Sequence, residues 1–295
     1  MLLPTPLMPT SLQPTSLQHE QALPMSPNRP DPGPAPLGHI GHIGHIGHIG
    51  PATTRTVPAI RQRLQRTHGV MGEDRSALSE AFKRLRSQLL QRLRVDGHSV
   101  VAVTSPRAVA GKSLTALNLA LALAAEPDRT VLLVDADLSG QGLQTLLGLE
   151  AEPGLGEHLS QGTPIGQLLL NPGLPRLVLL PAGSTGVQGA AEWLGARATG
   201  QLAHEFKHRY ANRVVIVDLP PLLDSADALS FMPWVDTTLL VVEEHGTTLA
   251  DLESANELLA PYALVGAVLT RPHPPSRAQP APRAAGWWRR LFRKP

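Results

Sequence analysis

The chain has 295 residues, of which 42% are hydrophobic and only 3% aromatic, so any core must be built mainly from aliphatic side chains. Its 26 Lys and Arg residues nearly balance its 24 Asp and Glu residues, and the net charge therefore does not indicate a nucleic-acid-binding protein. The absence of cysteine excludes disulfide bonds, thiolate metal sites and thiol catalysis, and it fits a reducing compartment.

Two further patterns concern the location of the protein. Residues 1–10 carry no basic residue ahead of an apolar run, so they do not match a secretory signal peptide. The longest apolar stretch, residues 114–125, is too short to span a bilayer. We therefore expect a cytoplasmic protein.

The N-terminal part of the chain has the composition of a disordered segment. Residues 1–57 are rich in Pro, Ser, Thr and Gln and contain a fourfold Gly-His-Ile repeat over residues 38–49. Its evenly spaced histidines suit a metal such as Zn or Ni, but no carboxylate accompanies them, which favours a low-complexity linker. We expect residues 1–57 to be disordered and residues 58–75 to form a linker.

A folded domain is predicted over residues 76–271. Apolar residues at helical spacing predict an amphipathic helix over residues 76–94. After it, aliphatic runs alternate with helix-length segments such as residues 113–125. The runs predict strands over residues 100–104, 130–135, 176–180, 213–218, 237–243 and 264–269. Continuous apolar strands are typical of a doubly wound α/β domain, with a mostly parallel sheet and helices on both faces.

The first of these strands leads into a candidate phosphate-binding loop. The segment 105–113 reads Ser-Pro-Arg-Ala-Val-Ala-Gly-Lys-Ser and opens directly onto a helix, so backbone N–H groups would face an anion. Pro106 stands where the strict P-loop motif has glycine, and Ala108 and Val109 replace residues that are often glycine. We expect a nucleotide to contact Arg107, Ala110, Gly111, Lys112, Ser113 and Leu114.

Carboxylates end two other predicted strands. Asp135 and Asp137 follow the strand over residues 130–135, and Asp218 ends the strand over residues 213–218. Ligands of open α/β sheets bind at the carboxyl ends of the strands, so these side chains should meet Lys112 and Ser113 in one crevice. Carboxylates are suited there to holding Mg²⁺ and to accepting a proton. The alternative is that they only cap helices.

These motifs resemble those of the bacterial tyrosine kinases of capsular and exopolysaccharide biosynthesis, particularly the exosortase-associated type, within the Min/Par-like P-loop ATPases. Besides the paired aspartates, the resemblance rests on the run Asp-Leu-Pro-Pro-Leu-Leu-Asp-Ser-Ala-Asp-Ala over residues 218–228 and on a Glu-x-x-Lys-x-x-Arg helix with Glu80 and Arg86. Shorter matches are Gly-Leu-Gly at 154–156, Leu-Pro-Ala-Gly at 180–183 and Ala-Ala-Glu-Trp-Leu at 190–194.

The resemblance implies that the chain binds ATP and Mg²⁺ and transfers the γ-phosphoryl group to tyrosine. It assigns catalysis to Lys112, Asp135 and Asp137, with Asp135 as the base, and the metal to Ser113, Asp137 and Asp218. It also implies a homo-oligomer formed through the helix that carries Glu80 and Arg86, although Lys83 replaces the first Arg of the motif. The implied partner is a membrane polysaccharide co-polymerase.

The chain departs from that family at its C-terminal end. Its only tyrosines are Tyr210 and Tyr262, which excludes phosphorylation of a tyrosine cluster in the tail. Instead, the tail over residues 272–295 places two Trp, a Leu and a Phe among basic residues, which favours contact with an anionic membrane surface or a partner over nucleic acid. Thr270 and Arg271 stand where the family often has an adenine-binding Asn.

Three functions are therefore compatible with the sequence. The first is an ATP-dependent tyrosine kinase-like regulator of exopolysaccharide biosynthesis that acts on a partner or on a tyrosine outside the tail. The second is a catalytically degraded, nucleotide-binding scaffold of the co-polymerase. The third is a Min/Par-type ATPase switch.

Overall fold

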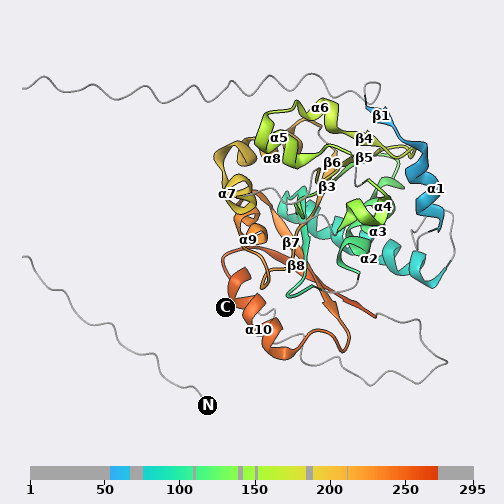
Figure 1. Cartoon of the computed structure of the whole chain (residues 1–295). Helices are drawn as coiled ribbons and strands as arrows, with labels where there is room; N and C mark the ends of the chain where they lie inside the picture. The colour runs from blue at the N-terminus through green and yellow to red at the C-terminus, as the bar shows by residue number, and fades with distance from the viewer. Residues whose placement is uncertain are drawn as a thin grey trace, which may run out of the picture. The chain divides into compact units, whose positions relative to one another are not determined.

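The computed structural model describes residues 54–66, 76–108, 111–138, 142–149, 152–183, 189–210 and 212–271 (Figure 1). The expectations for the N-terminal segment up to residue 53, with its histidine repeat, and for the basic tail from residue 272 concern residues outside this description.

A single eight-stranded sheet forms the centre of the described chain (Figure 1). The strand order is β1-β4-β5-β3-β6-β2-β7-β8, and every neighbouring pair is parallel except β4 and β5. This confirms the predicted doubly wound α/β fold. The strands are β1 (Arg55–Thr56), β2 (Val100–Thr104), β3 (Thr130–Asp135), β4 (Leu170–Asn171), β5 (Leu177–Leu180), β6 (Arg213–Asp218), β7 (Thr237–Glu243) and β8 (Leu264–Thr270).

Helices cover both faces of the sheet and supply its two cores. The first four pack on one face and the later ones on the other. They are α1 (Pro58–Arg66), α2 (Ala77–Asp96), α3 (Lys112–Ala124), α4 (Leu143–Leu147), α5 (Leu155–Gln161), α6 (Ile165–Leu168), α7 (Ala190–Gly195), α8 (Arg197–His208), α9 (Ala226–Phe231) and α10 (Leu249–Leu259), with a 3₁₀ turn η1 at Met232–Trp234. No described helix is both long enough and apolar enough to cross a membrane.

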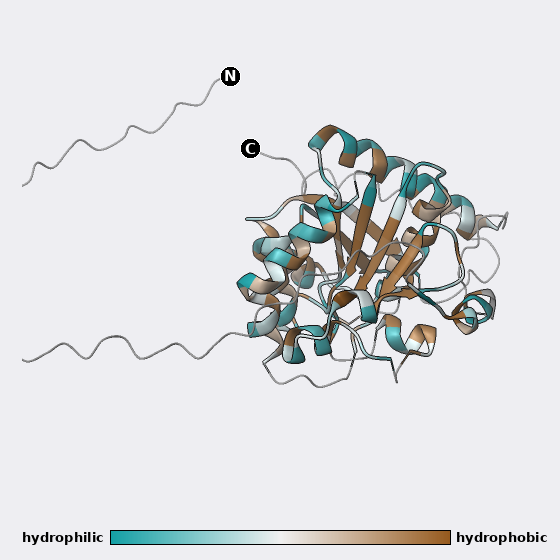
Figure 2. Ribbon diagram, turned by 90° about the horizontal axis from the view of Figure 1, so that it is seen from above, coloured by the Kyte–Doolittle hydropathy of each residue, from teal (hydrophilic) through white to brown (hydrophobic). Residues whose placement is uncertain are grey.

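The uninterrupted aliphatic runs explain this layered arrangement. Along β2, Val101 and Val103 point into one core while Val100 and Ala102 point into the other, because side chains alternate along a strand. A strand covered on both faces must therefore be apolar at every position, and the central strands are the brown arrows of Figure 2. Burying each Val or Leu contributes about 1.5–3 kcal/mol, so these strands carry much of the stability.

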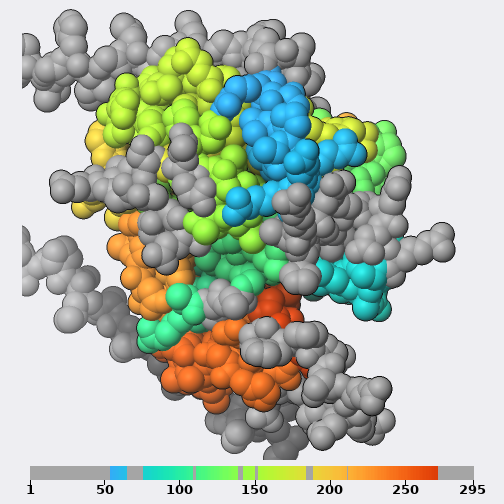
Figure 3. Space-filling model, turned by 45° about the vertical axis from the view of Figure 1, so that its right-hand side comes forward, coloured from blue at the N-terminus to red at the C-terminus, as the bar shows by residue number. Residues whose placement is uncertain are grey.

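The folded region begins earlier than the sequence predicted. Residues 54–66, assigned to the disordered segment and the linker, form β1 and α1, and Ile60 and Leu64 are each 1% exposed in the core. Arg55 of β1 pairs with Glu152, and α1, shown in blue, lies on the surface of the molecule in Figure 3. A two-residue strand is too short to show a sequence period, and α1 buries only Ile60 and Leu64, so both elements depend on packing against the domain.

Helix α2 is anchored by the arginine that the resemblance assigned to subunit contacts. Arg86 donates to the carbonyl oxygen of Ala122 at 3.1 Å and pairs with Glu126 at 3.0 Å, both at the C-terminal end of α3. A cation is favoured at this end of a helix. Glu80, by contrast, pairs at the surface with Lys83 at 2.8 Å. Within this chain, Arg86 therefore fastens α2 to α3.

This arrangement predicts unequal effects of two substitutions on α2. We expect Arg86→Ala to lower the free energy of unfolding by about 1–3 kcal/mol, because it removes a charged hydrogen bond at a half-buried position. We expect Glu80→Ala to change it little, because Glu80 is on the solvent side. Urea denaturation of both variants is the measurement. Equal losses would contradict the assignment of Arg86 as the anchor.

Candidate functional site

The predicted site residues meet at the carboxyl ends of three adjacent strands. Asp135 ends β3 and Asp218 ends β6, and the two are direct register partners. Asp218 is also the register partner of Val103 on β2, from which the candidate phosphate loop departs. Parallel strands bring their carboxyl ends to one edge, so residues 83 and 115 positions apart in the sequence lie side by side there.

The loop after β2 leads into the N-terminus of α3. The Ser105 hydroxyl donates to the carbonyl oxygen of Arg107 at 2.7 Å, and Gly111 has a φ of 102°, a conformation that favours glycine. Lys112 is the first residue of α3, with Ser113 and Leu114 in its first turn. A Cβ atom on Gly111 would lie 3.5 Å from the methyl carbon of Thr270, which places the end of β8 beside the loop. Val109 and Ala110 lie outside the described residues.

Lys112 is buried among carboxylates. Its side-chain amine lies 2.9 Å from Oδ1 of Asp218 and 3.4 Å from Oδ2 of Asp137, and the residue is 6% exposed. Burial alone would lower the pKa of Lys112, but Asp218 and Asp137 outweigh it and raise the pKa above its usual value. The lysine is therefore charged at neutral pH and available to a phosphate group.

Asp135 is the most strongly perturbed carboxyl group at this edge. It is 2% exposed, and its oxygens accept the backbone N–H groups of Asp137 at 3.2 Å and Gln144 at 3.0 Å. Burial, reinforced by the charges of Asp218 and Asp137, raises the pKa of Asp135 well above its usual value. Part of the helix-capping alternative is correct, since Asp135 binds the first turn of α4. Its raised pKa is nevertheless what a proton acceptor near neutral pH requires.

Three oxygen atoms face one point beside Gly142. A Cβ atom on this glycine would lie 3.2 Å from Oδ2 of Asp218, 3.2 Å from the Ser113 hydroxyl and 3.6 Å from Oδ1 of Asp135. Oδ2 of Asp218 is buried, and no described residue makes a hydrogen bond of normal geometry to it. Burial raises the pKa of Asp218 in spite of the nearby charge of Lys112.

This donor set fits a hard divalent cation such as Mg²⁺. Magnesium prefers oxygen ligands and keeps places for water and phosphate oxygens. Among the described residues, no three His, Cys, Asp or Glu side chains make a ready chelating cluster. A cation here would therefore draw on the Ser113 hydroxyl and on oxygens from a bound nucleotide.

The raised carboxyl pKa values predict a pH dependence of stability without metal. Between the usual value of 3.8 and the raised pKa, the folded state holds protons that the unfolded chain has lost. Stability therefore falls as the pH rises through this window, by up to about 1.4 kcal/mol per pH unit for each proton. Asp135→Asn should flatten the slope. Urea denaturation in EDTA from pH 5 to 8 tests this, and an equal slope in both proteins would contradict it.

Asp224, which was not among the predicted site residues, holds the loop in place. Its Oδ2 accepts the backbone N–H of Ala108 at 2.9 Å, and its Oδ1 pairs with Arg107 at 2.9 Å. Arg107 also pairs with Asp251, at the start of α10, at 2.7 Å. Arg107 is thus held by two carboxylates. The repeated aspartates in the run over residues 218–228 were the available sequence signal for Asp224.

Loosening this contact should affect nucleotide binding more than stability. In Asp224→Ala the Ala108 N–H loses its acceptor, and we expect nucleotide affinity to fall on the order of tenfold, which corresponds to one lost hydrogen bond. The melting temperature should change little, because the ion pair with Arg107 is exposed. Calorimetry and thermal melting, with Asp227→Ala as the control from the same segment, measure both. Unchanged affinity would show that Asp224 has no role in the loop.

Gln144 is a second residue that the sequence analysis missed. It is 1% exposed, its side-chain nitrogen donates to the carbonyl oxygen of Gly183 at 3.0 Å, and its side-chain oxygen accepts the Gly183 N–H at 3.1 Å. Glu157 accepts the N–H of Gly154 at 2.7 Å, and a side chain on Gly154 would overlap the carbonyl of Pro181. The two short glycine motifs therefore pack together and support the loop that carries Asp135. No local sequence pattern identifies Gln144.

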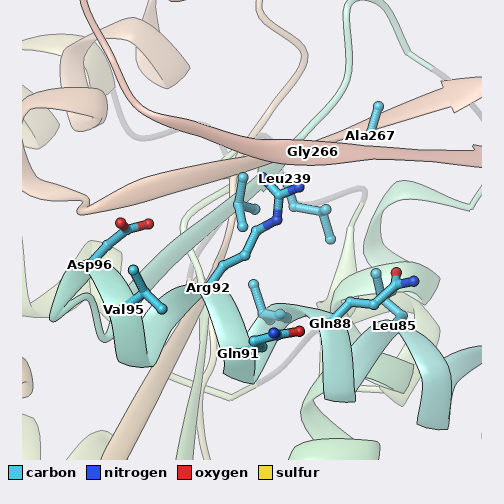
Figure 4. Close-up of a pocket in the computed structure, with 11 residues that line it drawn as sticks. Leu85, Gln88, Gln91, Arg92, Val95, Asp96, Leu239, Gly266 and Ala267 are labelled. Atoms are coloured by element: carbon cyan, nitrogen blue, oxygen red, sulfur yellow. The ribbon is translucent and has the colours of Figure 1, made fainter. Parts of the chain in front are cut away.

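A groove on another part of the protein contains none of the candidate site residues. It has a volume of about 700 Å³ and lies between α2 and the edge strand β8, with Arg92 pointing from the helix toward the strand (Figure 4). Its strand residues Leu239, Val265, Gly266 and Ala267 come from the amino-terminal halves of β7 and β8. It is therefore separate from the site at the carboxyl ends.

Comparisons with known proteins agree with this geometry. The model of the ParA family (NUBPL iron-transfer P-loop NTPase) matches residues 97–242. The tyrosine-protein kinase YwqD of Bacillus subtilis is 32% identical over 210 residues, which are 70% of this chain and 86% of YwqD. The succinoglycan biosynthesis transport protein ExoP of Rhizobium meliloti is 33% identical over 189 residues, which are 62% of this chain but only 23% of ExoP.

A solved structure supports the same assignment. The kinase domain of the Escherichia coli tyrosine kinase ETK aligns with a TM-score of 0.60 and 25% identity, covering 68% of this chain and 78% of that chain. The nucleotide-binding P-loop fold, the paired aspartates and the extent of the YwqD match lead to one conclusion. The chain belongs to the bacterial tyrosine-protein kinase family of P-loop proteins.

Proposed function

We propose that this protein binds ATP with Mg²⁺ and transfers the γ-phosphoryl group to a tyrosine hydroxyl, as a regulator of exopolysaccharide biosynthesis. The observation that carries the proposal is the convergence of Lys112, Asp135 and Asp218 beside the helix N-terminus of the phosphate loop. Phosphoryl transfer depends mainly on positioning and on charge stabilisation, and this arrangement supplies both.

Each residue has a role that follows from its contacts. The N-terminus of α3 and the loop N–H groups bind the phosphates, with Leu114 and Arg107 at the edges of the loop. Lys112 exchanges its longer contact, to Asp137 at 3.4 Å, for a phosphate oxygen and keeps Asp218 at 2.9 Å. Ser113, Asp137 and Asp218 would hold Mg²⁺. Bound Mg²⁺ supplies positive charge that neutralises the phosphate oxygens.

Asp135 acts as the proton acceptor. The tyrosine oxygen forms a bond to the γ-phosphorus as the bond to the β–γ bridging oxygen breaks, and ADP leaves with the bonding electrons. The phenolic proton passes to the Asp135 carboxylate, whose proton affinity is increased because burial raises its pKa. The two backbone N–H groups that bind Asp135 keep it in place.

The partner that we propose is a membrane polysaccharide co-polymerase. The relative ExoP is named as a transport protein of succinoglycan biosynthesis, and the match covers only a part of it. That relation supports a membrane protein of polysaccharide export as the partner of this kinase-like domain. The basic, Trp-containing tail suits contact at the membrane surface, and Glu80 on the solvent side of α2 suits contact with a second copy.

Calorimetry combined with a transfer assay on the same samples tests the proposal. The full chain should bind ATP·Mg²⁺ saturably, Lys112→Ala should not, and wild type should phosphorylate a Glu-Tyr copolymer or a tyrosine of its partner. Binding without transfer would leave the degraded scaffold as the function. Steady hydrolysis without tyrosine phosphate would leave the ATPase switch. No binding at millimolar ATP would overturn all three.

A further inference from the structure

The two tyrosines of the chain differ in their surroundings. Tyr210 follows α8, and the guanidinium carbon of Arg213 lies 3.9 Å from the centre of its ring. Tyr262 lies between α10 and β8 and packs partly buried against the apolar core. In the described part of the chain, a ring–guanidinium contact is recorded for Tyr210 and none for Tyr262.

Arg213 is a buried cation that lacks a full set of partners. It is 6% exposed, its backbone N–H donates to the carbonyl oxygen of Tyr210 at 3.1 Å, and its Nε makes no hydrogen bond to any described residue. Burial lowers the pKa of Arg213, Tyr210 opposes this shift, and Arg209 is close enough to reinforce it. Arginine stays charged in proteins, so positive charge accumulates beside the Tyr210 ring.

A phosphate group is the ligand that suits this place. Phosphotyrosine carries a charge of about −1.5 to −2 and three strong acceptor oxygens at neutral pH. Arginine binds such groups through paired N–H donors. Arg213 already interacts with the Tyr210 side chain, and a phosphate on that side chain would add formal negative charge and further acceptors, including one for the Nε to which no described residue hydrogen-bonds.

We propose that Tyr210 is a phosphorylation site of this protein, phosphorylated by a second copy of the chain. The inference rests on the proposed kinase function. Tyr210 precedes β6, whereas Asp218 ends it, so about 16 Å of extended strand separates Tyr210 from the carboxylates of its own chain. The acceptor must therefore enter the site of another molecule.

The step balances as an ordinary phosphoryl transfer. The hydroxyl oxygen of Tyr210 bonds to the γ-phosphorus of ATP held by the donor copy, and the bond from that phosphorus to the bridging oxygen breaks. ADP leaves with the electron pair, and the phenolic proton passes to the Asp135 carboxylate of the donor copy. The resulting phosphate lies beside Arg213 and Arg209 of the acceptor copy.

A mixing experiment with two variants of the full chain tests this. Lys112→Ala serves as an acceptor that cannot transfer, and Tyr210→Phe as a donor that lacks the acceptor. With ATP·Mg²⁺, neither should become labelled alone, but the mixture should carry phosphate on Tyr210 of the Lys112→Ala chain by peptide mass spectrometry. Tyr262→Phe is the matched control and should label like wild type.

The experiment distinguishes failure of the Tyr210 site from failure of the proposed kinase function. A Glu-Tyr copolymer in the same tubes reports whether Tyr210→Phe is an active kinase. Copolymer labelling without phosphate on Tyr210, or with phosphate on Tyr262 alone, would overturn the site and leave the kinase function intact. No labelling of copolymer or protein would overturn both.

Phosphorus NMR of the labelled protein gives a second readout that folding alone does not determine. The second ionisation of a free phosphotyrosine occurs at a pKa of about 6. Positive charge from Arg213 should shift this titration to lower pH in wild type, and Arg213→Gln should remove most of the shift. An unshifted titration in wild type would contradict the assignment of Arg213 as the receiving group.

Discussion

Lys112→Ala should abolish phosphoryl transfer and also destabilise the folded protein. The side chain pairs with Asp218 at 2.9 Å and Asp137 at 3.4 Å in a site where it is 6% exposed. Removing one partner of a buried ion pair leaves uncompensated charge, so we expect a loss of about 3 kcal/mol in unfolding free energy at pH 7. Loss of the phosphate contact should lower the transfer rate by about 10³-fold or more.

The loss of stability and the loss of transfer in Lys112→Ala should differ in their dependence on pH. Without Lys112, the carboxyl groups of Asp135 and Asp218 lose the nearby positive charge that lowers their pKa values, so both bind protons more readily. The stability lost at pH 7 should therefore shrink at pH 5, where the carboxylates take up protons. The transfer activity should stay lost at both values.

Lys112→Met is the matched control for side-chain volume. It should lose transfer as completely as Lys112→Ala and show the same stability trend with pH, because both lack the charge. Urea denaturation at pH 5 and 7 and a radioactive transfer assay are the measurements. A variant as stable as wild type at pH 7 would contradict the buried ion-pair network.

Gly142→Ala should lower the affinity of the site for Mg²⁺. Its effect on nucleotide binding in the absence of metal should be smaller. The added methyl group would lie 3.2 Å from both Asp218 Oδ2 and the Ser113 hydroxyl, closer than carbon normally approaches oxygen. It therefore occupies the point that these oxygens face and displaces them by a few tenths of an ångström. We expect the apparent Mg²⁺ affinity to fall at least tenfold and the transfer rate about 10–100-fold.

Gly195→Ala is the control for the substitution itself. Gly195 lies in α7, and an added Cβ atom would meet its nearest neighbours at 3.6 Å or more. Magnesium titration of ATP-dependent transfer, with ATP affinity measured in EDTA, distinguishes the two variants. Equal Mg²⁺ responses in Gly142→Ala and wild type would show that the cation lies elsewhere.

The sequence by itself determined the fold class and the position of the site. The predicted strands 100–104, 130–135, 213–218 and 237–243 coincide with β2, β3, β6 and β7. This succeeded because a strand buried on both faces must be apolar along its whole length, a pattern that is local and continuous. The convergence of Lys112, Asp135 and Asp218 followed from a general rule about the carboxyl ends of parallel strands.

Only the tertiary structure decided how individual side chains are partnered. Asp224 reaches Ala108, Gln144 reaches Gly183 and Arg86 reaches Glu126, and no sequence pattern identifies the partner of any of these residues. The short β1 and α1 are likewise too short to be stable alone, and they form because they pack against the domain. The physical reason is that local composition specifies an element, whereas the meeting of distant side chains depends on strand order, register and packing.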